Sequence, residues 1–502
     1  MTTDSIISKV WSFCHTLRDD GVGYGDYLEQ LTYLIFLKMA DEYSRPPHSR
    51  KVGVPPRYAW PIMRPLKGKE LEDHYVDALR ELGTQKGMLG QIFTKAQNKI
   101  QDPAKLARLI EMVDDVTWTT LDADTKGDIY EGILEKNAED TKSGAGQYFT
   151  PRALIKAMVA CVAPEPSKTI ADPACGTGGF FLASYDHLVN QRSLTPTQKR
   201  FLKNETFHGN EIVASTRRLC LMNLFLHNIG EIDGNSSIAS TDALIAQPAE
   251  TVDYVLANPP FGKKSSMTFT NEEGEQEKED LVYNRQDFWA TTSNKQLNFL
   301  QHIRSMLKTT GRAAVVLPDN VLFEGGAGET VRKKLMETTE LHTILRLPTG
   351  IFYANGVKAN VLFFDNRAAS KDVATKEVWY YDYRTNIHHT LKRKPLRIED
   401  LDEFIKCYNP DHRHKRKETW HAEKNPEGRW RKYTYTELVA RDKTSLDLFW
   451  LKDESLTDLD NLPEPEDLAE EIIENIEAGL ANFRAVASTL TLRKRSNADV
   501  TS

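Results

Sequence analysis

The segment with the clearest chemistry is Asn258-Pro259-Pro260-Phe261, which follows the apolar run 252–257. An apolar run of this length that ends at a breaker predicts a buried strand. Two consecutive prolines fix the backbone and remove two N–H donors, so the strand ends there and exposes its last carbonyls. A carboxamide, a rigid carbonyl-bearing turn and an aromatic ring suit the exocyclic amine of a planar base, whereas acyl or phosphoryl transfer needs N–H donors or metal ligands. Taken alone, the tetrapeptide could also be a plain strand-ending turn.

A glycine-rich turn lies upstream of this tetrapeptide. The short strand expected at 167–172 ends in Asp172 and runs into 173–180, Pro-Ala-Cys-Gly-Thr-Gly-Gly-Phe, after which a helical pattern begins. In such a unit a nucleotide-like cofactor meets backbone N–H groups at the helix N-terminus, and glycine lets the backbone approach closely. The next strand-like stretch, 206–211, ends in Glu211, where a carboxylate binds a ribose diol in such folds. These features together predict a nucleotide-type cofactor site.

Three motifs in this order resemble those of a known enzyme family. The glycine turn resembles the S-adenosylmethionine-binding motif of class I methyltransferases, and Asn-Pro-Pro-Phe resembles the catalytic motif of enzymes that methylate the amino group of adenine in DNA. The segment 146–152, Gly-Gln-Tyr-Phe-Thr-Pro-Arg, is similar to the additional cofactor motif of that family, and 241–244 is similar to its third motif. The order of the motifs matches the gamma arrangement of the family.

The resemblance implies which residues form the site. The catalytic residues are expected to be Asn258, Pro259, Pro260 and Phe261. The residues expected to bind S-adenosylmethionine are Gln147, Tyr148, Phe149, Thr150, Pro151, Arg152, Asp172, Gly176, Thr177, Gly178, Gly179, Glu211 and Asp242. In this assignment Asp172 orients the glycine turn or the methionine amino group, Glu211 holds the ribose hydroxyls, and Asp242 lies near the cofactor adenine. Helix N-capping is the alternative for Glu211 and Asp242, and no metal is expected.

Helical patterns fill the chain before the catalytic region. Leu28, Leu31, Ile35 and Met39 form one apolar helix face, and a second such face lies within 106–113. A chain of 502 residues is long enough for two or three domains. The divisions that we expect are an α-helical N-terminal domain at 1–140, a catalytic domain at 141–370, a mixed C-terminal extension at 371–462 and a helix at 463–490. The apolar stripe of that last helix packs on its own domain or on a partner subunit, and the family resemblance favours the partner subunit.

A helical N-terminal domain joined to such a core resembles the modification subunit of a type I restriction–modification system. The resemblance implies an α/β fold, in which a class I S-adenosylmethionine-dependent, Rossmann-like methyltransferase core lies between an α-helical N-terminal domain and a C-terminal helical extension. It implies site-specific adenine-N6 methylation of double-stranded DNA, which protects host DNA. It also implies as partners a DNA-specificity subunit and a motor-nuclease restriction subunit, with two copies of this chain in each methylase complex.

The charge balance agrees with this division of labour. The chain has 65 basic and 72 acidic residues and a net charge of −7, whereas a protein that binds many phosphates by itself usually has a basic face. The one dense basic run, 412–417, is either a solvated loop or a phosphate contact. Five cysteines without zinc spacing indicate a reducing cytosol. Because neither a signal peptide nor a long apolar run is present, we expect a cytoplasmic protein without a membrane segment.

Segments outside these motifs predict further elements of the fold. The polar, charged stretch 262–287 predicts a mobile loop, which either becomes ordered when DNA arrives or is an inert insertion. A core helix is expected to begin at Gln296. Later strands are expected at 313–317, 359–364 and 378–383.

Two other classes of function remain open. One is a methyltransferase that acts on a glutamine side chain or an RNA base; the motif at 146–152 and the helical N-terminal region argue against it. The other is a noncatalytic binding subunit, against which the intact glycine turn, carboxylate and Asn-Pro-Pro-Phe argue. The sequence has neither a Gly-x-x-x-x-Gly-Lys-Ser/Thr loop nor a convincing nuclease carboxylate–lysine cluster, so cleavage and translocation are expected of partners.

Overall fold

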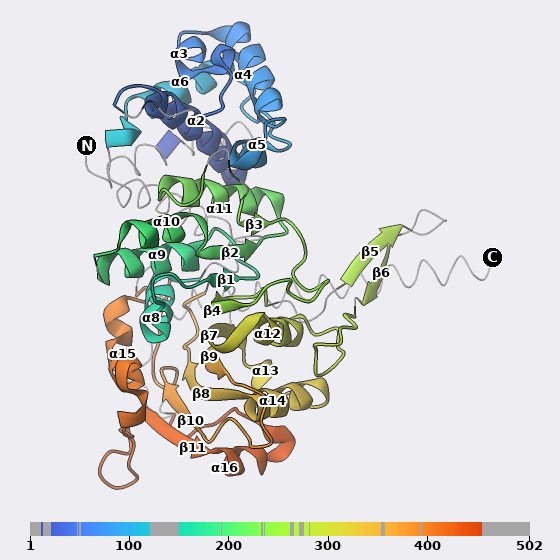
Figure 1. The fold of residues 1–502 in the computed structure, drawn as a ribbon, viewed down its shortest axis with the longest axis vertical. Coiled ribbons are helices and arrows are strands. Elements are labelled where there is room, and N and C mark those ends of the chain that lie inside the picture. Colours follow the sequence, from blue (N-terminus) through green and yellow to red (C-terminus); the bar gives the residue numbers. More distant parts are fainter. Residues whose placement is uncertain are drawn as a thin grey trace, which may run out of the picture.

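The computed structural model of this chain is elongated and built around one central β-sheet (Figure 1). It describes residues 12–13, 22–47, 49, 52–120, 150–191, 193–231, 234, 236–261, 266–270, 276–280, 282–352, 357–391 and 394–453. A stack of N-terminal helices lies beyond one edge of the sheet, and the last described strands lie at the other edge.

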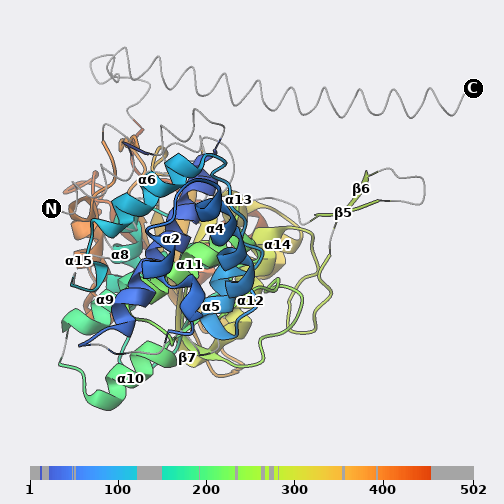
Figure 2. The same ribbon diagram turned by 90° about the horizontal axis from the view of Figure 1, so that it is seen from above.

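The N-terminal helices pack against one another through apolar faces. They are α2 Tyr24–Ser44, α3 Trp60–Met63, α4 Gly68–Leu82, α5 Gly87–Phe93 and α6 Pro103–Asp114, with short 3-10 helices η1 Pro56–Tyr58 and η2 Trp118–Thr120. The four residues predicted to form a face of α2 are fully buried, which confirms that prediction. Helices α2 and α5 pack on α11 Ala214–Leu226 of the sheet region (Figures 1 and 2). One hydrophobic core therefore runs from the N-terminal helices into the sheet region.

In the described part of the chain, nine strands form the central sheet in the order β11-β10-β8-β9-β7-β4-β1-β2-β3. The strands are β1 Ile170–Asp172, β2 Phe207–Asn210, β3 Ile238–Ala239, β4 Val252–Ala257, β7 Leu307–Pro318, β8 Thr339–Arg346, β9 Ala359–Asn366, β10 Glu377–Asp382 and β11 Trp430–Thr434. The pairs from β3 to β7 are parallel, β9 is antiparallel to both of its neighbours, and β11 is antiparallel to β10. Parallel strands place their carboxyl ends on one edge, where open α/β sheets bind ligands.

Helices cover both faces of the sheet, so its strands are buried on both sides. Alternate residues of one strand enter different cores: Leu256 faces the core shared with the N-terminal helices, and Val255 faces the second core. The remaining helices are α8 Arg152–Val162, α9 Gly179–Gln191, α10 Pro196–Asn204, α12 Lys295–Met306, α13 Asn320–Phe323, α14 Ala327–Thr338, α15 Asp402–Tyr408 and α16 Tyr435–Val439. Three 3-10 helices complete the described elements: η4 Ile398–Leu401, η5 Pro410–Lys415 and η6 Asp442–Thr444.

Most expected elements are present. The α/β fold and the strand at 252–257 are confirmed, and the strand expected at 167–172 is shorter. Strands β7 and β9 include the segments predicted at 313–317 and 359–364, whereas β10 ends at Asp382, one residue before the predicted end of 378–383. The core helix begins at Lys295, one residue before the predicted start. Strands β10 and β11 extend the same sheet beyond residue 370, where the mixed extension was expected to begin. The helix expected at 463–490 lies outside the described residues.

The segment 262–287, predicted to be a mobile loop, contains two strands that the sequence did not predict. Strands β5 Ser266–Thr270 and β6 Gln276–Asp280 pair antiparallel there and project from the body of the molecule (Figures 1 and 2). A two-stranded ladder pairs the backbone groups that face the other strand and leaves the outer ones to water, so it can form in polar sequence. Within the described ranges, no helix has the length and apolarity needed to cross a membrane.

Candidate functional site

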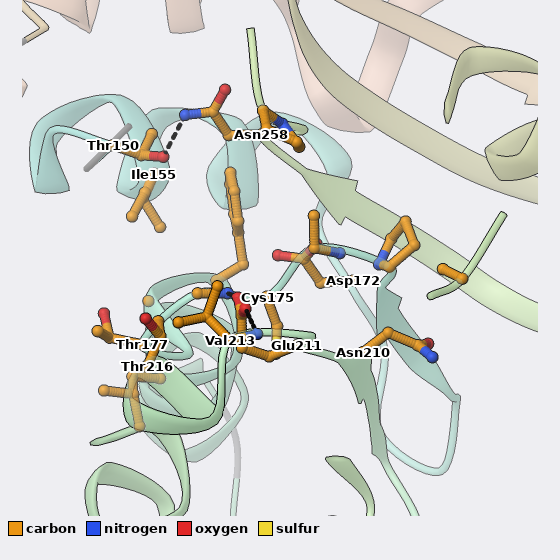
Figure 3. Close-up of a pocket in the computed structure, with 18 of the residues that line it drawn as sticks. Thr150, Ile155, Asp172, Cys175, Thr177, Asn210, Glu211, Val213, Thr216 and Asn258 are labelled. Atoms are coloured by element: carbon orange, nitrogen blue, oxygen red, sulfur yellow. Dashed lines mark hydrogen bonds between the residues drawn. The ribbon is translucent and has the colours of Figure 1, made fainter. Parts of the chain in front are cut away.

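A cavity of about 710 Å³ opens at the carboxyl ends of β1, β2 and β4 (Figure 3). Its volume lies within the range of about 300–1,000 Å³ that is usual for small-molecule sites. The predicted site residues that line it are Thr150, Arg152, Asp172, Gly176, Thr177, Gly179, Glu211, Asp242, Asn258 and Pro260. The fold thus brings together residues more than a hundred positions apart in the sequence, as the carboxyl-edge rule predicts for an α/β sheet.

The glycine turn after β1 has a backbone that only glycine adopts easily. Gly176 and Gly178 have φ angles of 56° and 87°, in the left-handed region. A Cβ on Gly178 would also lie 3.0 Å from the Cys220 sulfur. The Asn223 amide donates to the Thr177 carbonyl across 3.0 Å and fixes the middle of the turn from α11. The turn is therefore close to its neighbours and rigid before any ligand binds.

Two carboxylates stand at the ends of neighbouring strands in this cavity. Asp172 is 2% exposed and accepts a hydrogen bond from the Ala174 N–H across 2.9 Å. Burial, and to a smaller extent the nearby Glu211 carboxylate, raise the pKa of Asp172 to about 8, although the hydrogen bond from Ala174 opposes the shift. Glu211 accepts from the backbone N–H groups of Gly176 and Val213, at 3.1 and 2.7 Å, while burial raises its own pKa. A cavity with two desolvated acids favours a ligand that carries positive charge.

Asp242 lies at the third corner of the cavity and is held by two hydrogen bonds. Its carboxylate accepts from the Leu244 N–H at 2.9 Å and from the Tyr283 hydroxyl at 2.7 Å. Leu244, Tyr283 and Phe299 form a small apolar cluster beside it. The local contact closes a turn and is no helix N-cap, because no described helix begins between β3 and β4, and the Tyr283 hydroxyl adds a partner from a distant segment. Phe299 of this cluster also lines the cavity, and an acid beside an aromatic side chain suits a ring that carries an amino group.

The Asn258 carboxamide lies where β4 ends, across the cavity from Glu211 (Figure 3). It is 8% exposed, and its nitrogen donates to the Thr150 hydroxyl across 2.7 Å. Pro259 is buried, and Phe261 contacts the ring of Phe352 edge-on, with centroids 5.6 Å apart. The four residues are therefore a rigid turn that presents one carboxamide to the cavity.

The comparisons with known proteins agree with this geometry. Residues 121–438 match the family model described as N-6 DNA Methylase, and residues 6–113 match the one described as HsdM N-terminal domain. The type I restriction enzyme EcoKI methylase subunit of Escherichia coli strain K12 is 37% identical, over 98% of this chain and 96% of its own. The chain belongs to the family of type I restriction enzyme methylase subunits. The StySPI methylase subunit of Salmonella potsdam is 36% identical over the same shares.

Solved structures show the same relationship. The crystal structure of the EcoKI M protein superposes with a TM-score of 0.53 at 33% identity, over 97% of this chain and 96% of that one. A type I restriction–modification structure superposes with a TM-score of 0.71 over 98% and 99% of the two chains, and at 24% identity it shows the fold alone. The methylase subunit thus has the class I S-adenosylmethionine-dependent methyltransferase fold that the motifs predicted. It is a DNA adenine-N6 methyltransferase, and its methyl donor is S-adenosylmethionine.

The cavity of this methylase fits that donor. S-adenosylmethionine carries a sulfonium, an amino group, a ribose diol and an adenine, and the cavity offers desolvated acids and an apolar wall. The glycine turn lets the backbone come close to a ligand at Gly176, where a Cβ would meet no protein atom within 4 Å. The residues present therefore suit the donor's charge and shape.

Some predicted site residues lie elsewhere or cannot be placed. Gln147, Tyr148 and Phe149 lie outside the described residues. Pro151 precedes α8 as its N-cap, and Gly178, Pro259 and Phe261 support the cavity without lining it. Their roles stay predictions.

Other residues of the site were not predicted. Asn223 and Tyr283 hold predicted residues in place, and Ile212 lines the cavity with an apolar side chain that is 66% exposed. An isoleucine directly after the strand-ending Glu211 was a usable signal for a ring-contacting residue. Asn223 and Tyr283 had none, because their partners lie 46 and 41 residues away.

Cys175 and the basic run 412–417 make contacts inside the molecule. Cys175 is buried, and its thiol beside Cys220 has a pKa well above the usual value, so the thiol is unsuited to nucleophilic attack. Within the basic run, Arg413 pairs with Asp365, and Arg416 donates to the Tyr408 carbonyl. Two of the charges in the run are thus engaged inside the molecule, which leaves fewer of them for a phosphate contact. In the described ranges, no group of three or more potential metal ligands occurs.

Proposed function

We propose that Asn258-Pro259-Pro260-Phe261 is the turn that binds the target adenine of this methyltransferase. The observation that carries the proposal is the position of Asn258, which lines the same cavity as Asp172 and Glu211 and has its carboxamide nitrogen bonded to Thr150. With the nitrogen turned to Thr150, the carboxamide oxygen is turned away from Thr150 (Figure 3).

The Asn258 oxygen and the Pro259 carbonyl accept the two hydrogens of the adenine amine. Positive charge grows on the amine nitrogen during methylation, so these fixed acceptors stabilise the transition state more than the ground state. The amine lone pair is conjugated with the ring in free adenine, and two such hydrogen bonds favour a more tetrahedral nitrogen. The proton of the methylated nitrogen leaves to solvent.

The target adenine leaves the DNA duplex to reach this turn. Base flipping costs a few kcal/mol because pairing and stacking are lost. Phe261 stacks on the extruded ring, and such stacking contributes roughly 1–3 kcal/mol per base. The edge-on contact with Phe352 helps to hold the Phe261 ring in place. Binding the flipped base therefore recovers part of the cost of flipping.

The glycine turn and the three carboxylates hold the cofactor. S-adenosylmethionine supplies an electrophilic methyl group on its sulfonium, so no metal or covalent enzyme intermediate is needed. Asp172 binds the methionine amino group, Glu211 the ribose hydroxyls, and Asp242 the adenine region. The segment 147–152 contributes contacts to the methionine and adenosine parts.

The chain works in a larger assembly. Its membership of the type I family supports partnership with a DNA-specificity subunit that reads the bases and with a motor-nuclease restriction subunit. The net charge of −7 supports the same division, because it gives little phosphate affinity of its own. We assign two copies of the chain to each methylase complex, a cytoplasmic location, and protection of host DNA together with support of restriction. We also propose that the domain boundaries of the chain lie near residues 140, 370 and 462.

Methylation by an Asn258→Ala variant tests the proposal. Assembled with the specificity subunit, the variant should lose methylation of DNA that carries the recognition site, while isothermal titration still detects S-adenosylmethionine binding close to the parental affinity. Asn386→Ala, which lies outside the cavity, serves as the matched asparagine control. A near-parental methylation rate for Asn258→Ala would overturn the proposal.

A further inference from the structure

The turn that carries Asn258 is held at both ends by side chains that lie far away in the sequence. Thr150 is 108 residues before Asn258, and Gln296 is 35 residues after Phe261. We propose that Thr150 and Gln296 are positioning residues that fix the amine-binding groups of the turn. The inference rests on the proposed role of Asn258 and adds the residues that aim it.

Thr150 acts on the first residue of the turn. Its hydroxyl accepts a hydrogen bond from the Asn258 carboxamide nitrogen at 2.7 Å, and both residues line the cavity. A carboxamide has a donor end and an acceptor end of nearly the same shape, so only its hydrogen bonds decide which end faces a ligand. The donor end is engaged by Thr150, which turns the acceptor end the other way (Figure 3). If the Asn258 carboxamide were reversed, its N–H groups would face the adenine amine, which is itself a hydrogen-bond donor.

The place of Thr150 in the chain makes it a firm support. It directly precedes Pro151, whose fixed φ angle restricts Thr150 to extended backbone. Pro151 in turn is the N-cap of α8, and α8 packs against β4 and β7 of the sheet. The hydroxyl is thus anchored by the same sheet that carries Asn258.

Gln296 acts on the last residue of the turn. It lies in the first turn of α12, is fully buried, and donates from Nε2 to the Phe261 carbonyl at 2.5 Å. The other end of the same amide, Oε1, is buried without a hydrogen-bond partner in the described part of the chain. An unsatisfied buried acceptor lowers stability, and a leucine of similar size would avoid that cost. Packing alone therefore does not explain a glutamine at position 296. The hydrogen bond that holds the Phe261 carbonyl does explain it.

The two contacts together preorganise the turn. Thr150 lies before a helix on one face of the sheet, and Gln296 lies on α12, which packs in the core of the other face. Between them the two prolines leave the backbone little freedom to move. The carboxamide of Asn258, the carbonyl of Pro259 and the ring of Phe261 are therefore held in place before DNA arrives. Such fixed dipoles accelerate reactions because they need no rearrangement in the transition state.

The first experiment compares Thr150→Val, Thr150→Ser and Asn258→Ala in the assembled methylase complex. Valine matches threonine in shape but has no hydroxyl, and serine keeps the hydroxyl. We expect Thr150→Val to lower kcat roughly ten- to a hundredfold, as misplacement of a reacting group does, and Thr150→Ser to restore most of it. Titration with S-adenosylmethionine should give dissociation constants within about threefold of the parental value, the size of one weak hydrogen bond. Fluorescence of 2-aminopurine at the target position should report base flipping as in the parent.

The outcomes separate this inference from the proposed function. Parental kcat in Thr150→Val, beside an inactive Asn258→Ala, would overturn the role of Thr150 alone. Activity in Asn258→Ala would overturn the proposed function itself. A Thr150→Val protein whose kcat is normal but whose cofactor affinity has collapsed would make Thr150 a cofactor ligand only, against the inference.

The second experiment uses two glutamines of the same helix. Gln296→Leu removes the bond to Phe261, whereas Gln301→Leu removes two bonds to the backbone of Ala290, outside the turn. We expect Gln296→Leu to lower kcat roughly tenfold at saturating cofactor, in line with a lost positioning contact, and Gln301→Leu to lower the melting temperature with kcat kept. Where Gln296→Leu does not fold, Gln296→Asn, whose amide is too short to reach, replaces it. Equal loss of kcat in the Gln296 and Gln301 variants would overturn the role of Gln296.

Discussion

Arg218 on α11 and Glu29 on α2 form a buried ion pair between residues 189 positions apart, which joins the sheet region to the N-terminal helices. The Arg218 guanidinium also donates to the backbone carbonyls of Ile92 and Thr94, at 2.7 and 2.8 Å. All three acceptors of Arg218 belong to the N-terminal helical region, whereas its own backbone belongs to α11. Three bonds from one planar guanidinium fix both the distance and the angle between the two parts. The N-terminal helices are therefore attached firmly to the edge of the sheet that holds the cofactor cavity.

Replacement of Arg218 by methionine should loosen this attachment. Burial already raises the pKa of Glu29 despite the nearby Arg218, so loss of the guanidinium leaves a desolvated acid and two carbonyls without their donor. We expect the free energy of unfolding to fall by about 3–5 kcal/mol, as for other broken buried pairs. Urea denaturation followed by circular dichroism measures it. Arg80→Met, at an exposed pair with Asp77, should change stability by less than about 0.5 kcal/mol, and an equal loss in both variants would contradict the prediction.

The sequence predicts the parts of this site that are local. An apolar run with two prolines defines β4 and its turn, and a strand before glycines defines the cofactor loop at Gly176. Each of these signals comes from neighbouring residues whose backbone preferences agree. The family resemblance then assigns roles to side chains such as Asp172 and Asn258, because the motifs keep their order along the chain.

Contacts between distant segments could not be predicted in this way. Nothing near Tyr283 or Gln296 indicates that their partners are Asp242 and the Phe261 carbonyl, since the partners meet only after the sheet forms. The hairpin of β5 and β6 was also missed, because its polar composition gives no buried face for a period-two pattern to reveal. Residues that aim the catalytic groups are therefore harder to find than the groups themselves.

Asp172 should make the stability of the protein without cofactor depend on pH. Its pKa is about 8 in the cavity and about 3.9 in an unfolded chain. Between pH values of about 4 and 8, Asp172 is therefore protonated in the folded protein and ionised in the unfolded chain. The stability that this carboxyl group contributes is fully present below about pH 4 and is lost as the pH rises through about 8. We expect Asp172→Asn, without cofactor, to melt progressively higher than the parent between pH 5 and pH 8. Differential scanning calorimetry at several pH values measures the gap, and a constant difference would contradict the prediction.

A second measurement tests the same carboxyl group with ligand. A cationic ligand favours the ionised acid, so the parental affinity for S-adenosylmethionine should rise between about pH 6 and pH 8. The ligand's own amino group also titrates near this range. Asp172→Asn serves as the control, because it shares that ligand titration but lacks the carboxyl group. Identical pH profiles from isothermal titration of the two proteins would rule out Asp172 as the ionising group.

Glu211 should contribute to binding both through the ligand and through the glycine turn. Its carboxylate accepts a hydrogen bond from the Gly176 N–H and is turned to the cavity, so Glu211→Ala removes the proposed ribose partner and loosens the turn (Figure 3). We expect the dissociation constant of S-adenosylmethionine to rise at least tenfold, which is about 1.4 kcal/mol. Isothermal titration measures it, with Glu205→Ala, an exposed acid before β2, as the matched control. An affinity of Glu211→Ala within twofold of the parental value would contradict both roles.

Tyr283 should contribute to cofactor affinity but not to the chemical step. Its hydroxyl donates to Asp242 at 2.7 Å, while its ring packs with Leu244 and Phe299. Tyr283→Phe keeps the ring and removes the donor, so Asp242 loses one of its two hydrogen bonds. We expect the affinity for S-adenosylmethionine to fall about three- to tenfold, equivalent to about 0.5–1.5 kcal/mol for one hydrogen bond.

Kinetics of the same variant separate binding from chemistry. With saturating cofactor, kcat of Tyr283→Phe should equal that of the parent, because Asp242 lies on the cofactor side of the cavity and the amine-binding turn is unchanged. Tyr435→Phe, at a partly exposed tyrosine on α16, is the matched control and should alter neither quantity. A lower kcat with unchanged affinity would move Tyr283 from the cofactor site to the catalytic turn. The most direct route for such an effect is the chain itself, since β5 and β6 connect Tyr283 to Phe261.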